Sequence, residues 1–178
     1  MDPSLQQDIT LANEINNGSR AALERVVRRH LAPVYGYVLH RLGLGKDELA
    51  ARITSDAFDA AMRGMRRYPR GDGTVPMRSW LLRLANRRIA RLKLKKPKHS
   101  DQLDGTADDL RALQEAVAEM KGKQGAALAL ALFGEMPPEE IATALGVSRR
   151  AAMRSLRLAL RHMGKAHFTQ PEDWSLDG

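Results

Sequence analysis

Residues 137–148 of the chain read PPEEIATALGVS, and this stretch is the clearest indication of fold in the C-terminal third. Pro138 suits the first turn of a helix, where its missing N–H costs nothing, and the two glutamates that follow complement the helix dipole. Gly146 can adopt the left-handed conformation of a tight turn, and Ser148 can cap a second helix. Ala142 is small enough for that helix to cross closely. The stretch therefore predicts a helix-turn-helix unit.

The second helix of this unit, which begins at residue 149, is strongly basic. In a helix-turn-helix the second helix enters the major groove, where arginine can fork onto guanine edges or pair with phosphates. The alternative is a plain helical hairpin with an arginine-rich face. The residues that we expect to contact duplex DNA are Ser148, Arg149, Arg150, Arg154 and Arg157.

Charge is distributed in blocks along the chain. Residues 62–98 hold thirteen bases and one acid, and residues 141–165 hold six bases and no acid. Between them, residues 99–140 hold nine acids and three bases. Two basic blocks separated by an acidic one indicate two contacts with a polyanion. The alternative is a pair of solvated basic helix faces.

Composition favours an all-α protein. Of the 178 residues 43% are apolar and only 4% aromatic, so the core must be built mainly from aliphatic residues and alanine, which suit helices. There is no cysteine, and therefore no disulfide or thiolate metal site. No apolar run is long enough for a membrane span, and the N-terminus lacks the features of a secretory signal. We expect a cytoplasmic protein without membrane insertion.

Helical periodicity and breaker residues divide the chain into a series of helices. Asn17-Gly18 ends the first helix, Ser19 can cap the second, and Pro33 is expected to kink it. Residues 77–95 combine an apolar stripe with arginines on the remaining faces. The expected helices cover residues 5–16, 19–42, 47–67, 77–95, 108–120, 124–133 and the helix-turn-helix to 164.

From about residue 19 to residue 164 the chain resembles the extracytoplasmic-function (ECF) sigma factors, small promoter-recognition subunits of bacterial RNA polymerase. Three stretches carry the resemblance: LAPVY at 31–35, MRSWLLRLANRR at 77–88, and the helix-turn-helix. The resemblance implies two small helical domains, a sigma region two bundle and a sigma region four helix-turn-helix, joined by a flexible linker. The implied divisions are 1–95 for region two, 96–107 for the linker, 108–166 for region four and 167–178 for a C-terminal tail.

By the same resemblance, the helix after residue 77 would melt and read the minus-ten element, and the helix-turn-helix would read the minus-thirty-five element. Residues 68–77 would cradle a flipped base, while Trp80 is expected in the core. The implied partners are core RNA polymerase and promoter DNA, with an anti-sigma factor left open and no cofactor or metal. The implied minus-ten residues are Arg78, Arg83, Asn86, Arg87, Arg88 and Arg91.

The chain departs from the family where the polymerase should dock. The family carries an acid-rich stretch there, but this chain reads LAARITSDAF at residues 49–58. Arg52 stands where an acid is usual, and a reversed charge facing a basic partner would weaken docking. The residues implied for core-polymerase docking are Arg52, Ser55, Asp56 and Phe58.

Two other functions remain open. A sigma-like regulator that binds DNA but forms no standard holoenzyme would explain the altered docking helix. A helix-turn-helix repressor should instead bind intact duplex as a dimer without polymerase. An enzyme is least favoured, because the five histidines show no ligand spacing and no phosphate loop or nucleophile motif occurs.

Overall fold

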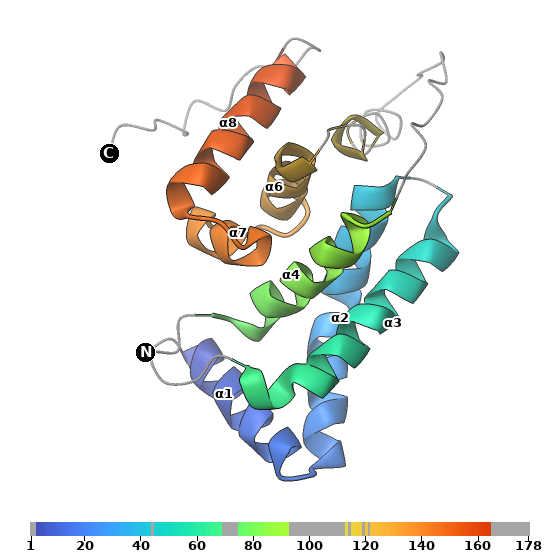
Figure 1. Ribbon diagram of the computed structural model, residues 1–178, viewed down its shortest axis with the longest axis vertical. Helices are drawn as coiled ribbons and strands as arrows, with labels where there is room; N and C mark the ends of the chain where they lie inside the picture. Colours follow the sequence, from blue (N-terminus) through green and yellow to red (C-terminus); the bar gives the residue numbers. More distant parts are fainter. Residues whose placement is uncertain are drawn as a thin grey trace.

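The computed structural model describes residues 3–43, 45–68, 75–92, 113, 115–118, 120 and 122–164, and the described part is built of helices (Figure 1). The predicted all-α class is therefore confirmed. Helices α1 to α4 form a lower bundle, and α6 to α8 lie above it (Figure 1). The predicted linker, 96–107, and the predicted tail, 167–178, lie outside the described residues.

The first four helices follow the predicted order. Ser19 caps α2 by accepting a hydrogen bond from the N–H of Ala22 at 3.2 Å. The helix continues through Pro33, so this proline does not end it. A short 3₁₀ turn, η1, extends α3. The bounds are Pro3–Asn16 for α1, Arg20–Leu42 for α2, Asp47–Gly64 for α3, Met65–Arg67 for η1 and Met77–Ile89 for α4.

Apolar stripes at helical spacing bring these four helices together. The central α2 contacts α1, α3 and α4, and its Val26, Val34 and Val38 are completely buried. Leu81 of α4 is also fully buried. Removing aliphatic side chains from water is the main favourable term in such a bundle.

The C-terminal helices form the predicted helix-turn-helix. Helix α6 spans Gly122–Leu132, α7 spans Pro138–Leu145 and α8 spans Arg149–Gly164. Gly146 ends α7 in the left-handed conformation, with φ 62° and ψ 45°. The N–H of Ala151 donates to Ser148 Oγ at 3.3 Å, so Ser148 caps α8 as expected.

The two groups of helices are packed against each other. Helix α7 lies on the N-terminal half of α4, and α6 contacts α2 (Figure 1). The buried apolar residues of both groups form one continuous cluster. This arrangement goes beyond the expectation of two modules connected by a linker, because it gives the described parts a shared interface.

Candidate nucleic-acid interface

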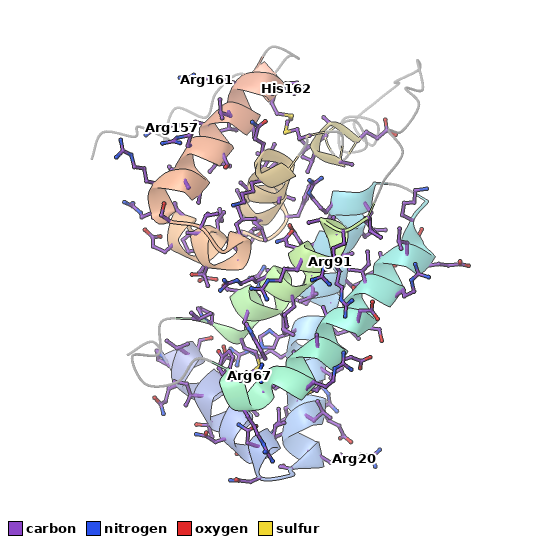
Figure 2. All side chains as sticks on the ribbon, in the orientation of Figure 1. Arg20, Arg67, Arg91, Arg157, Arg161 and His162 are labelled. Carbon is purple, nitrogen blue, oxygen red and sulfur yellow. The ribbon has the colours of Figure 1, made fainter. Side chains whose placement is uncertain are left out.

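The outer face of α8 carries a row of exposed basic side chains. The residues predicted to contact duplex DNA, Ser148, Arg149, Arg150, Arg154 and Arg157, are all exposed. Figure 2 shows Arg157 and Arg161 pointing away from α6 and α7. The opposite face of α8 buries Ala152, Leu156 and Ala159 against the preceding helices. This separation leaves the basic face of α8 free to enter a groove of DNA.

A left-handed glycine and an exposed ion pair lie at the turn between α7 and α8. Gly146 turns the chain, and Arg149 Nε lies 2.7 Å from Glu139 Oε1 across the turn. Both side chains of this ion pair are exposed, so its contribution to stability is small. Arg149 could therefore exchange Glu139 for a phosphate at little cost.

Helix α4 presents the predicted minus-ten residues in two different settings. Arg87 and Arg91 are exposed and Arg88 is partly exposed, all toward the C-terminal end of the helix. The side chains of Arg78, Arg83 and Asn86 are instead engaged within the protein. Asn86 Oδ1 accepts a hydrogen bond of 2.6 Å from the hydroxyl of Tyr37. Arg78 and Arg83 lie against the turns that follow α6 and α7, at Gly134 and Gly146.

Burial raises the pKa of Tyr37 to about 12, although nearby Arg41 and the hydrogen bond to Asn86 lower it in part. The neutral phenol is therefore the stable form in the core. The Tyr37 hydroxyl therefore keeps the proton that it donates to Asn86 Oδ1.

The predicted base-cradling segment, residues 68–77, is held at both ends, although residues 69–74 lie outside the described part. The Tyr68 hydroxyl donates to the carbonyl of Val75 at 2.7 Å, joining one end of the segment to the other. The Tyr68 ring also lies 5.0 Å from the ring of Trp80 at a tilt of 55°. Trp80 is partly buried against the core, as expected of a packing residue rather than an open stacking surface.

Asp8 is a site residue that the sequence reasoning missed. It is 2% exposed and accepts a hydrogen bond of 2.9 Å from the N–H of Met77, the first residue of α4. Helix α4 has no side-chain cap of its own, so α1 supplies one. Asp8 shares a helical face with Leu11, Ala12 and Ile15, and an acid on an apolar face could have signalled this role.

The predicted docking residues on α3 are divided between surface and core. Arg52 and Ser55 are exposed and Asp56 is partly exposed. Phe58 is only 7% exposed and belongs to the core, so it can support a docking surface only from beneath. Helix α3 lies on the side of the bundle away from α8 (Figure 1).

Within the described residues, no cluster of three or more histidines and carboxylates could hold a metal ion. The same residues contain no helix with the length and apolar character needed to cross a membrane.

Comparison with known proteins gives this geometry its context. Residues 110–163 match the family described as sigma-70, region 4. The fold over 90% of this chain is similar to that of CnrH, which was solved in complex with the cytosolic domain of CnrY. The TM-score is 0.69, with 96% of that chain covered and 19% identity. At this level of identity the likeness to CnrH shows a shared fold. No curated protein matches it in sequence. The region 4 match covers α6, α7 and nearly all of α8, while α1–α4 lie outside it.

Proposed function

We propose that this chain directs bacterial RNA polymerase to promoters, with α8 reading the minus-thirty-five duplex and α4 binding the separated minus-ten strand. The observation that carries the proposal is the basic, exposed face of α8 on a helix-turn-helix that lies within the region 4 match. Positive charge on a helix shaped for the major groove provides both phosphate contacts and base readout.

The arginines at the C-terminal end of α4 and just beyond it support the second half of the proposal. Arg87, Arg88 and Arg91 can track the backbone of a single strand, a mainly electrostatic task. The segment that precedes α4 is closed at its base by Tyr68 and Asp8, which fits a loop that must hold an extracted base. Extracting a base costs a few kcal/mol, so a firm pocket favours some sequences over others.

The first experiment asks for promoter-dependent initiation. The purified chain is mixed with bacterial core RNA polymerase and fragmented genomic DNA, and transcripts are sequenced from their 5′ ends. The expected result is initiation at a limited set of sites that share upstream sequence. Failure of the chain to co-purify with core polymerase at low salt would contradict the proposal and favour a regulator that forms no standard holoenzyme.

A matched pair of variants tests the role of α8. Arg154→Ala removes an exposed arginine from α8, and Arg63→Ala removes an exposed arginine from α3. Arg154→Ala should weaken binding to a selected promoter duplex about tenfold, as expected for loss of one good base or phosphate contact. Arg63→Ala, with the same change in net charge, should change it less than twofold. Equal losses would show that only net charge matters.

We also propose that a protein partner regulates the chain. CnrH was solved bound to the cytosolic domain of CnrY, and this chain shares its fold. Co-purification of the tagged chain from its native cells, followed by mass spectrometry, should recover such a partner together with polymerase subunits. A helix-turn-helix repressor would instead be recovered as a homodimer on intact duplex without polymerase.

A further inference from the structure

The N-terminal half of α4 is covered by the C-terminal helices. Ser79 is completely buried, with its hydroxyl 3.4 Å from Glu140 Oε2 on α7. Arg78 Nη2 donates to the carbonyl of Gly134, in the connection before α7. Two side chains of the proposed minus-ten helix therefore have partners in region 4.

Arg83 lies directly over the turn of the helix-turn-helix. A Cβ atom added to Gly146 would be 3.0 Å from Arg83 Nε and 3.2 Å from its Nη2. The glycine therefore leaves the space that the guanidinium occupies. The turn that positions the duplex-reading helix is also in contact with the helix proposed to bind a single strand.

Arg41 joins the two parts at a second point. It is 8% exposed at the end of α2, and its guanidinium donates to four main-chain carbonyls. These belong to the end of the helical stretch 115–118 and the start of α6, at 3.1–3.5 Å: Val117, Ala118, Met120 and Gly122. A cation is favourable at the C-terminal end of a helix, where carbonyls lack partners.

The contacts around Arg41 are close on both sides. The ring of His40 stacks on that of Phe133 with centroids 3.9 Å apart and an angle of 15°. A Cβ at Gly43 would lie 3.4 Å from the Cβ of Ala118. The end of α2 therefore lies close to the C-terminal part both before and after Arg41 in the sequence, at His40 and at Gly43.

From these contacts we infer that the free chain is closed: region 4 packs on part of the strand-binding surface of α4. The hydrogen bonds of Arg41 hold region 4 in this position. The inference rests on the proposed function of α4. Region 4 and a single strand of DNA compete for Arg78 and Arg83. The affinity of the chain for a single strand therefore decreases as the fraction of closed chains increases. The exposed faces of α3 and α8 are not part of the contact, so polymerase and duplex can bind first.

A reversible cross-link tests the inference, because the chain contains no cysteine. Gly43→Cys together with Ala118→Cys places two thiols at a Cβ separation that suits a disulfide. The free chain should oxidise to an intramolecular disulfide, scored as a mobility shift on a non-reducing gel. Adding Arg41→Met should slow this reaction about tenfold. An unchanged rate would overturn the role of Arg41.

Folding controls keep this test decisive. Gly43 has a positive φ of 88°, so Gly43→Cys alone reports any strain from that substitution. If Arg41→Met lowers helix content by circular dichroism, Arg41→Lys replaces it, since lysine keeps the charge but loses the planar fork that reaches several carbonyls. Arg41→Lys should also slow the formation of the disulfide.

The second readout compares the oxidised and reduced forms of the same double variant. A fluorescein-labelled, mixed-sequence 20-nucleotide single strand should bind the reduced form at least fivefold more tightly by anisotropy. A mixed-sequence duplex, bound through α8, should bind both forms equally. Equal single-strand affinity would overturn the competition. Loss of both DNA affinities in the reduced form would instead contradict the proposed function, while the oxidation rates still decide whether the chain is closed.

Discussion

At the scale of single residues, Gly146 shows how one position can satisfy two requirements. Its φ of 62° is a conformation that a residue with a Cβ adopts only at a cost, and its missing side chain makes room for Arg83. The first requirement is local and can be read from the sequence. The second arises only because α4 lies over the turn.

Gly146→Ala should therefore lower the free energy of unfolding by about 1–2 kcal/mol, the usual cost of placing an L-residue in this region. Urea unfolding followed by circular dichroism measures it. The matched control is Gly36→Ala inside α2, where nothing lies within 4 Å of an added Cβ and φ is not positive. That change should stabilise the chain by about 0.5–1 kcal/mol. Destabilisation by both would contradict the explanation.

Asp8 is the second residue with a specific expectation. Asp8→Ala leaves the buried N–H of Met77 without its acceptor, which should cost about 1–3 kcal/mol in urea unfolding. Asp8→Asn keeps an oxygen that can accept from Met77 and should cost less. If the two variants were equally destabilised, the negative charge near Arg29 and His30, rather than the hydrogen bond, would be the important feature.

Tyr37 predicts how stability depends on alkaline pH. Its pKa of about 12 in the folded chain lies above the usual value of 10, so between pH 10 and 12 the folded chain keeps a proton that the unfolded chain loses. Stability is therefore full below pH 10 and falls as pH rises through this window, by up to about 1.4 kcal/mol per pH unit for one proton. Tyr37→Phe should make this slope shallower, as measured by unfolding at a series of pH values. An unchanged slope would contradict the assignment.

At the scale of elements, α2 connects the whole molecule. It contacts α1, α3, α4 and α6, and its last turn carries His40 and Arg41. Pro33 lies inside it and is exposed, which removes one hydrogen bond from the middle of the helix. Packing on several sides compensates for this local cost.

Pro33→Ala should stabilise the chain, because alanine restores the missing N–H and favours the helix by up to about 3 kcal/mol. The control is Pro138→Ala at the first turn of α7, where a proline is well tolerated and the change should be near zero. Thermal unfolding compares the two. A destabilised Pro33→Ala chain would mean that α2 needs the proline for its shape.

At the scale of the whole molecule, the shared core predicts cooperative unfolding. The buried cluster runs from α1 through α4 to α8, so neither half should unfold without exposing apolar surface of the other. Calorimetry should give one transition with equal calorimetric and van't Hoff enthalpies. Two separate transitions would show that the halves are independent and would weaken the case for a closed chain.

Local patterns along the chain were enough to predict its local structure. The all-α class, the helix-turn-helix with Gly146 and Ser148, and the basic face of α8 all follow from composition, periodicity and capping, which act over a few residues. Phe58 shows the limit of this reasoning, because the stretch predicted for docking places its aromatic ring in the core.

The long-range partners follow from how the helices pack, and local sequence patterns do not predict them. Asp8 reaches Met77 across 69 positions, and Arg41 reaches Met120 across 79. A local sequence pattern does not predict which distant residue accepts a hydrogen bond, because the partner depends on how the helices cross. The same applies to Arg78 and Arg83, whose charge indicates nucleic acid, while their present partners are the carbonyl of Gly134 and the turn at Gly146.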